Sequence, residues 1–198
     1  MKRSSGILLP VFSLPSKYGI GCFSWEAYDF IDFLCDAGQS YWQILPLVPP
    51  GECESPYSSP STFAGNPLFI DLEQLIIQQL LTREEIESYE WDDSNMINYP
   101  QVKENKMKLL YTAFMRSNHY KDQWFIQFCK DNEYWLDEYA IYMEFKEGKP
   151  VDYYIFEQYI FDIQWRRIRE YANRKGIKIL RLNLKIVSRK GGFCGKNI

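Results

Sequence analysis

The sequence is poor in the residues that most often build metal sites and hydrolase triads. Its 198 residues contain a single histidine, His119, and five cysteines that show neither CxxC nor Cys/His spacing. A tetrahedral zinc site needs several such ligands, and a Ser-His-Asp triad needs a well-placed histidine. We therefore expect no metal site and reduced thiols. His119 follows Ser117 and Asn118 in a polar stretch, which predicts a solvated side chain.

Long apolar runs and blocks of basic residues are also missing. No segment approaches the ~18 consecutive apolar residues of a membrane span, and no signal-peptide core follows Met1. The net charge is -3, without the basic cluster that marks a nucleic-acid or membrane partner. GxGxxG, P-loop and GxSxG motifs do not occur. The sequence thus predicts a cytoplasmic protein with no cofactor, no nucleic-acid partner and no membrane partner.

Aromatic residues are abundant by contrast, at 17% of the chain, with 15 Tyr, 13 Phe and 6 Trp. Aromatic faces suit sugar rings and flat ligands as well as protein cores. A tyrosine-rich core is the alternative interpretation, and composition alone does not choose between the two. With 46% hydrophobic residues, the chain is expected to build one core.

The order of apolar segments predicts an α/β fold. Residues 6–12 and 41–47 are expected to be strands, and a helix capped by Ser24 and stopped at Gly38 lies between them. A strand, a helix and a strand joined by short connections favour a parallel pair with a right-handed crossover. A late helix ending before Gly176 leads into a third predicted strand at 177–180.

Several helical segments separate the second strand from the third. One begins with a capping box formed by Thr82 and Glu85, and Trp124, Trp135 and Tyr139 recur at helical spacings that favour packing between helices. The expected organisation is two βα units, a helical insertion subdomain, a helix with the third strand, and a basic tail, at residues 1–72, 73–150, 151–180 and 181–198.

Two loops follow the first two strands, at residues 13–23 and 48–68. In a parallel barrel these loops would gather at the C-terminal face, where barrel enzymes keep their active sites. The second loop is rich in hydroxyl groups, and Tyr57 offers a ring on which a sugar could stack. Hydroxyls that only satisfy turn backbone are the alternative. Glu52 and Glu54 are neighbours in this loop, and we expect them to be solvated charges rather than a catalytic pair.

A specific resemblance to a known family lies in four sequence segments: SGILLPVFSLPSKYGIG, EAYDFIDFLCDAGQSYWQILPL, SPY and STFAGNPLFIDLEQL. They closely resemble the N-terminal part of the bacterial amylomaltases, or disproportionating enzymes, which are 4-alpha-glucanotransferases of glycoside hydrolase family 77. The resemblance continues more loosely to about residue 179. It implies the N-terminal part of a (β/α)8 TIM barrel, with about three parallel strands and a helical insertion between strands 2 and 3.

The resemblance also implies an activity and a substrate. Family members transfer α-1,4-glucan segments between maltooligosaccharides through a covalent glycosyl-enzyme intermediate, in a retaining double displacement. The serine and tyrosine of SPY line the family's donor sugar site, which carries over to Ser55 and Tyr57. Tyr99 resembles an aromatic residue that accompanies an accessory glucan contact. The implied partners are an α-1,4-glucan and the C-terminal portion of the same enzyme.

Three departures from the family pattern limit what carries over. Glu52 occupies a position that is usually aromatic, and the chain is short between Gly148 and Tyr153. Residues 181–198 do not resemble the family, and its nucleophile, acid/base and third carboxylate have no counterparts here, so no catalytic residue is assigned. We therefore expect a chain that ends early and is inactive alone. The alternative is a non-catalytic glucan-binding or interaction fragment.

Overall fold

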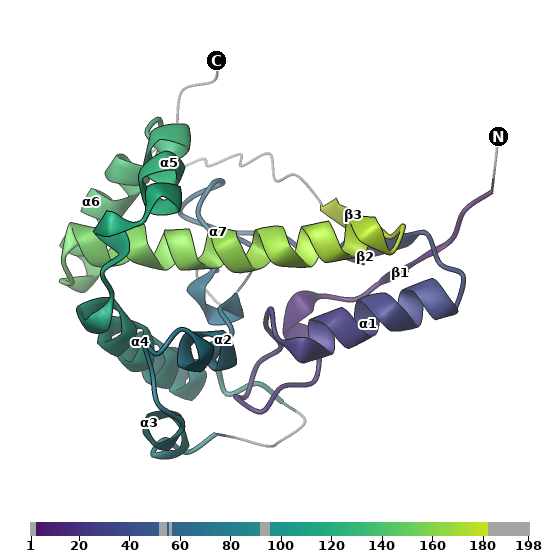
Figure 1. Ribbon diagram of the computed structural model, residues 1–198, viewed down its shortest axis with the longest axis horizontal. Coiled ribbons are helices and arrows are strands. Elements are labelled where there is room, and N and C mark those ends of the chain that lie inside the picture. Colours follow the sequence, from purple (N-terminus) through teal and green to yellow (C-terminus); the bar gives the residue numbers. More distant parts are fainter. Residues whose placement is uncertain (1–2, 52–54, 56, 92–95, 182–198) are drawn as a thin grey trace.

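The computed structural model describes residues 3–51, 55, 57–91 and 96–181, and these form a three-stranded parallel sheet with helices around it (Figure 1). The strands β1 (Gly6–Leu8), β2 (Tyr41–Ile44) and β3 (Lys178–Arg181) lie in that order. Gly6 is in register with Tyr41, which in turn pairs with Lys178. The prediction of three parallel strands is confirmed.

Two of the strands, β1 and β2, are shorter than the sequence predicts. β1 ends two residues before Pro10, which has no backbone N–H for a ladder, and Val11–Ser13 form the 3-10 helix η1 instead. β2 ends at Ile44, although Leu47 is still buried. The strands predicted at 6–12 and 41–47 were therefore too long. An apolar run indicates burial, but it does not show that each residue hydrogen-bonds to a neighbouring strand.

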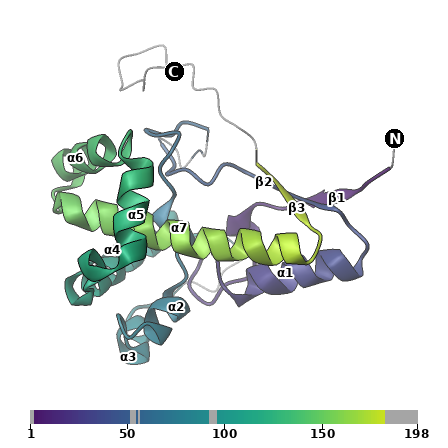
Figure 2. The same cartoon turned by 45° about the horizontal axis from the view of Figure 1, so that its top comes forward.

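Two helices cover one face of the sheet, as Figures 1 and 2 show. They are α1 (Trp25–Asp36) and α7 (Val151–Arg174), and both connect parallel strands. The Tyr171 hydroxyl of α7 hydrogen-bonds both carboxylate oxygens of Asp32 in α1, at 2.8 Å each. Ser24 begins α1 as predicted, but its hydroxyl bonds the Glu26 carboxylate rather than a backbone N–H.

The remaining helices lie between β2 and α7 in the sequence and gather beyond the C-terminal ends of the strands (Figure 2). The predicted capping box is confirmed: the Thr82 hydroxyl accepts from the Glu85 N–H, and the Glu85 carboxylate accepts from the Thr82 N–H. In chain order these elements are η3 (Pro67–Phe69), α2 (Leu72–Ile77), α3 (Arg83–Glu87), α4 (Tyr99–Arg116), η4 (His119–Lys121), α5 (Gln123–Asn132) and α6 (Leu136–Glu147).

One hydrophobic core runs from the sheet and the two helices that cover it into the helices between β2 and α7. Trp135 and Tyr139 are buried in it, as predicted, but Trp124 is 73% exposed, so its predicted packing role was wrong. His119 is half-buried against the rings of Phe114, Phe125 and Phe156 rather than solvated. Burial lowers the pKa of its imidazole.

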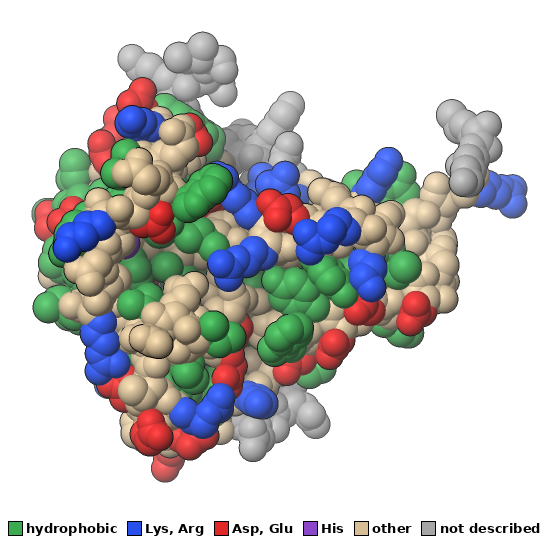
Figure 3. All heavy atoms as spheres, in the orientation of Figure 1, with side chains coloured by type: hydrophobic (Ala, Val, Ile, Leu, Met, Phe, Trp, Pro, Cys, Tyr) green, Lys and Arg blue, Asp and Glu red, His purple; other side chains and the backbone are tan. Residues whose placement is uncertain are grey.

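The surface carries both signs of charge among hydrophobic side chains (Figure 3). Among the helices in the described part of the chain, none has the length and hydrophobicity needed to cross a membrane. Cys22, Cys35 and Cys129 are free thiols, and Cys53 and Cys194 lie outside the described residues.

Candidate functional site

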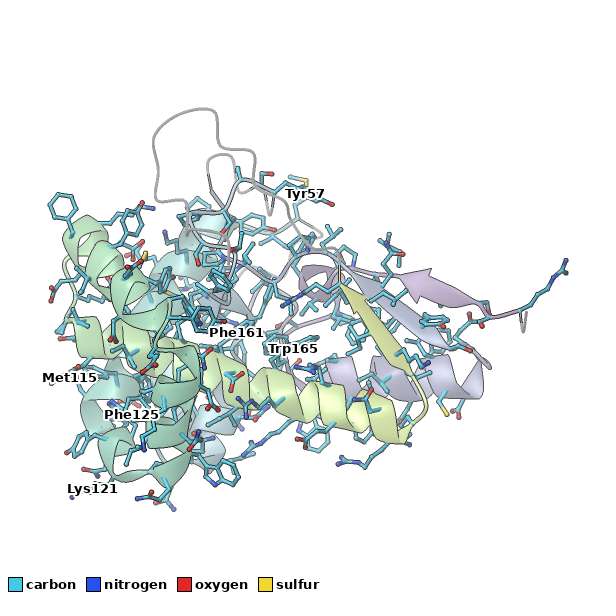
Figure 4. All side chains as sticks on the ribbon, turned by 90° about the horizontal axis from the view of Figure 1, so that it is seen from above. Tyr57, Met115, Lys121, Phe125, Phe161 and Trp165 are labelled. Carbon is cyan, nitrogen blue, oxygen red and sulfur yellow. The ribbon has the colours of Figure 1, made fainter. Side chains whose placement is uncertain are left out.

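The candidate site is the loop that leaves the C-terminal end of β2. The backbone closes this loop where the Asn66 N–H donates to the Leu47 carbonyl at 2.7 Å. Parallel sheets bind ligands outside the carboxyl ends of their strands, because the loops there converge from neighbouring strands. Figure 4 shows Tyr57 in this loop, on the far side of α7 from Phe125 and Lys121.

Ser55 is the centre of a tight turn. Its carbonyl accepts from the N–H groups of Gly51 and Ser58, both at 3.3 Å, and its hydroxyl accepts from the Tyr57 N–H at 3.3 Å. A Cβ on Gly51 would lie 1.5 Å from the Ser58 carbonyl oxygen, so the close approach requires glycine. The structure thus brings Ser55 and Tyr57 together in one turn.

Tyr57 presents its ring to solvent from this turn. Its side chain is 52% exposed, so the ring is accessible to a ligand. An exposed ring held by a backbone turn can stack on a sugar at low conformational cost, and its hydroxyl remains a donor and acceptor. The geometry therefore suits a neutral, polyhydroxylated ligand.

Other hydroxyls of the loop serve the loop itself. The Ser59 hydroxyl donates to the Ser61 carbonyl at 2.7 Å, and the Ser61 hydroxyl accepts from the N–H groups of Phe63 and Ala64. Asn66 is buried, and its side chain caps η3 by accepting from the Leu68 N–H at 3.1 Å. The alternative interpretation of the hydroxyls therefore holds for Ser59 and Ser61, and the Ser55 hydroxyl also accepts from a backbone N–H of its own turn.

Two buried glutamines of α7 fix the end of the loop, and we call them the glutamine clamp. Gln158 donates to the Gly65 carbonyl at 3.0 Å and accepts from its N–H at 2.7 Å. Gln164 makes the same pair of bonds with Asp71, at 3.1 and 2.7 Å. Each amide satisfies a backbone donor and acceptor that burial would otherwise leave unpaired.

A buried lysine adds a third anchor between the two glutamines. The Lys106 ammonium is fully buried and donates to the carbonyls of Leu68 and Ile70 at 2.7 and 2.9 Å. Burial lowers the pKa of Lys106, while the charges of Cys22 and Asp71 act in the opposite direction. The segment from Gly65 to Asp71 is thus held by side chains from both α4 and α7.

The loop after β1 is tied down on its own side. The Tyr18 hydroxyl donates to the Glu73 carboxylate at 2.5 Å, and Arg83 pairs with the same carboxylate at 2.8 Å. This Arg83 guanidinium holds the pKa of Glu73 below its usual value. The Tyr18 ring also packs edge-on against Trp91, with centroids 5.2 Å apart. Both loops of the C-terminal face are therefore built on fixed supports.

An aromatic cluster borders the loop that carries Tyr57. The Phe63 ring stacks on Trp135 with centroids 6.1 Å apart and meets Tyr134 edge-on at 5.4 Å. Phe63 and Tyr134 are 54% and 65% exposed. Phe63 lies in the same loop as Tyr57, so the apolar surface of the site extends from the loop onto the segment before α6.

The third predicted site residue, Tyr99, occupies a different element. It is the first residue of α4 and is half-buried against the hydrophobic core. Glu52 and Glu54 lie outside the described residues. Among the described residues, no group of three histidine, cysteine or acidic side chains is arranged to hold a metal ion.

The sequence interpretation missed the anchors of the loop. Lys106 had a detectable signal, because it falls on the same helical face as Val102, Leu109 and Ala113, where a lysine is out of place. Gln158 and Gln164 lie on the buried side of α7 among aromatic residues, but their partners are distant in the sequence. Periodicity identifies a buried face and not the backbone group that it meets.

Comparison with known proteins identifies a family and relatives that this chain resembles. The profile of a family described as 4-alpha-glucanotransferase matches residues 9–152. The 4-alpha-glucanotransferase of Clostridium butyricum is 40% identical in a match that covers 86% of this chain and 41% of that protein. The protein of that name from Aquifex aeolicus is 36% identical and is matched over 42% of its length. The chain thus spans about two fifths of these relatives.

A solved structure matches the fold as well as the sequence. The amylomaltase from Streptococcus agalactiae in complex with acarbose superposes with a TM-score of 0.83 at 30% identity. The match covers 91% of this chain and 43% of that structure. The sheet, its helices and the segment between β2 and β3 are therefore similar in arrangement to one part of that protein.

Proposed function

Because this chain belongs to the 4-alpha-glucanotransferase family, glycoside hydrolase family 77, we propose that the loop carrying Ser55 and Tyr57 binds a glucose unit of an α-1,4-glucan. The observation that carries the proposal is the exposed Tyr57 ring on a turn built around Ser55. Ring stacking with hydrogen bonds to vicinal hydroxyls is the interaction that a pyranose needs.

The anchoring of the loop supports the same proposal. Binding sites work best when the residues that touch the ligand are held by rigid elements. The glutamine clamp and Lys106 attach the segment after the loop to α7 and α4, so a sugar meets a preformed surface. Tyr99 is proposed as an accessory glucan contact, on its resemblance to the family's aromatic residue.

The transfer reaction is proposed for the whole enzyme to which this segment corresponds. That reaction would be a retaining double displacement on α-1,4-glucans, in a (β/α)8 barrel that includes the helices between β2 and β3 as an insertion. The remaining portion of the enzyme is the proposed protein partner. Further parallel strands would continue the sheet beside β3, where Leu180 is 46% exposed.

We also propose that the enzyme acts in the cytoplasm. The free thiols of Cys22, Cys35 and Cys129 support this proposal, because disulfides are rare in reducing compartments.

Calorimetric titration of the chain with maltoheptaose tests the binding proposal. We expect binding that Tyr57→Ala weakens at least about fivefold, which is the loss of roughly 1 kcal/mol of stacking. Tyr142→Ala is the matched control, because Tyr142 is also an exposed tyrosine, at 40%, but lies on α6. Equal affinities for the two variants would refute the proposed site.

A maltotriose assay separates binding from transfer. The family's catalytic carboxylates have no counterparts in these 198 residues, so we expect the chain to bind glucan without releasing glucose. This is the non-catalytic glucan-binding alternative. Glucose release above the blank, lost in Tyr57→Ala but retained in Tyr142→Ala, would instead assign the transfer reaction to this chain.

A further inference from the structure

A hollow lies between α5 and α7. It has a volume of about 760 Å³ and is bounded by α5, α7, the end of α2 and the segment from Ser117 to His119. Figure 3 shows hydrophobic side chains on this face between α5 and α7, with cationic side chains along α7. The size falls within the usual range for ligand clefts, about 300–1,000 Å³. We call it the α5–α7 groove.

The floor of the groove is apolar and its rim carries an exposed indole. Phe128, Tyr159 and Ile160 form the floor, each 4% exposed. Trp124 stands at the rim with 73% of its side chain exposed. The Asp122 carboxylate caps α5 through the Trp124 N–H and accepts from the Tyr159 hydroxyl at 2.6 Å. The backbone that carries the indole is therefore fixed to the floor.

Polar side chains on the rim come in donor and acceptor pairs. Gln127 donates to the Asp131 carboxylate at 2.7 Å on α5. On α7, the Arg166 guanidinium contacts the Asp162 carboxylate at 2.7 Å. These planar groups retain further donors and acceptors toward the groove. An arrangement of this kind suits the vicinal hydroxyls of a sugar.

The charge of the lining argues against anionic ligands. The lining includes four acidic residues and two arginines, which leaves it net negative, and Arg166 is already paired with Asp162. An anion would meet Asp131 and Glu170. A neutral polyol avoids this repulsion, because hydroxyls accept from guanidinium and donate to carboxylate.

We propose that the α5–α7 groove is an accessory binding site for a linear maltooligosaccharide, with one glucose ring stacked on Trp124 and hydroxyls held by Asp131, Gln127 and Arg166. The identity of the ligand rests on the proposed function, which supplies an α-1,4-glucan as substrate. Figure 4 shows Phe125 of α5 on the other side of α7 from Tyr57, so a polymeric glucan held beside α5 is tethered outside the loop site.

Maltoheptaose titrations of single variants test the groove. Trp124→Ala is expected to raise the Kd of maltoheptaose for the groove at least about fivefold. Trp25→Ala is the matched control, because Trp25 is 67% exposed but lies on α1. Asp131→Ala is the second probe, since its exposed side chain can be removed without disturbing the floor. The proposed groove site is refuted if Trp124→Ala and Asp131→Ala both bind maltoheptaose with the same Kd as Trp25→Ala.

The Tyr57→Ala variant separates the two proposals. With the loop site removed, maltoheptaose should still protect an exposed indole from acrylamide quenching, and Trp124→Ala in the same background should abolish that protection. Loss of all binding in Tyr57→Ala alone supports the loop site and overturns the groove. Binding that depends on Trp124 and not on Tyr57 supports the groove and overturns the loop site. Binding that depends on neither overturns both.

Discussion

The side-chain amide of Gln158 and the backbone of Gly65 exchange two hydrogen bonds, of 2.7 and 3.0 Å, in opposite directions. Both residues are buried, and Gly65 leaves space for the Phe161 ring that lies beside it. This relationship fixes where the loop that carries Ser55 and Tyr57 rejoins the helical part of the molecule.

Gln158→Leu should destabilise the protein by about 2–4 kcal/mol, because it leaves a buried N–H and a buried carbonyl without partners. Urea unfolding followed by circular dichroism measures the loss. Gln123→Leu is the control, since Gln123 is exposed at the start of α5. Similar midpoints for the two variants would contradict a role for the clamp in stability.

Gly65→Ala should cost about 1–3 kcal/mol through overpacking, because the added Cβ would lie 2.3 Å from the Phe161 ring. Phe161→Leu in the same chain should recover part of that loss by vacating the ring's space. A double-mutant cycle of thermal unfolding free energies measures the coupling. Strict additivity of the two changes would show that the ring and the loop do not constrain each other.

Lys106→Met keeps the length and the apolar stem of the side chain but removes the donor to Leu68 and Ile70. We expect a loss of about 1–3 kcal/mol, because two buried carbonyls lose a hydrogen bond. Lys108→Met provides the comparison on the same helix, where the ion pair with Glu104 is exposed and contributes little. A Lys106 variant as stable as the Lys108 variant would remove Lys106 from the anchors.

Glu157 should make stability depend on pH near neutrality. Burial raises the pKa of its carboxyl from the ordinary 4.5 to about 7, although the Tyr153 hydroxyl donates to it at 2.9 Å. The folded state therefore holds a proton that the unfolded chain releases. The stabilisation is complete below about pH 4.5 and is lost as the pH rises through about 7, by roughly 3 kcal/mol in total.

Glu157→Gln should flatten that profile, since the amide still accepts from Tyr153 but does not ionise. Chemical unfolding at a series of pH values, compared with Glu138→Gln on the exposed side of α6, gives the measurement. Parallel curves for the wild type and Glu157→Gln between pH 4.5 and 7 would place the pH dependence elsewhere.

The sequence predicts the parts of this fold that depend on local signals. The Thr82 and Glu85 capping box and the three parallel strands follow from short-range patterns, and the structure confirms them. Strand ends were less predictable. Leu47 is buried but lies beyond the end of β2, so its hydrophobicity wrongly suggested that the strand extends to it.

The candidate site was predictable as a loop but not as a supported surface. Ser55 and Tyr57 stand out by residue type and resemblance. The exposure of Trp124 could not be read from helical spacing, because a tryptophan at an apolar position favours packing between helices, which is the role predicted for it. The groove beside it depends on how α5 meets α7, which is a tertiary property.

The spacing of the glutamine clamp has a consequence for the timing of folding. Gly65 and Asp71 each meet a glutamine 93 residues further along the chain. During synthesis the loop is therefore made long before these two anchors, which form only after most of α7 has left the ribosome, whereas Lys106 on α4 is available earlier. The glutamine clamp is thus the later of the two supports to form, and it completes the segment that follows the surface carrying Tyr57.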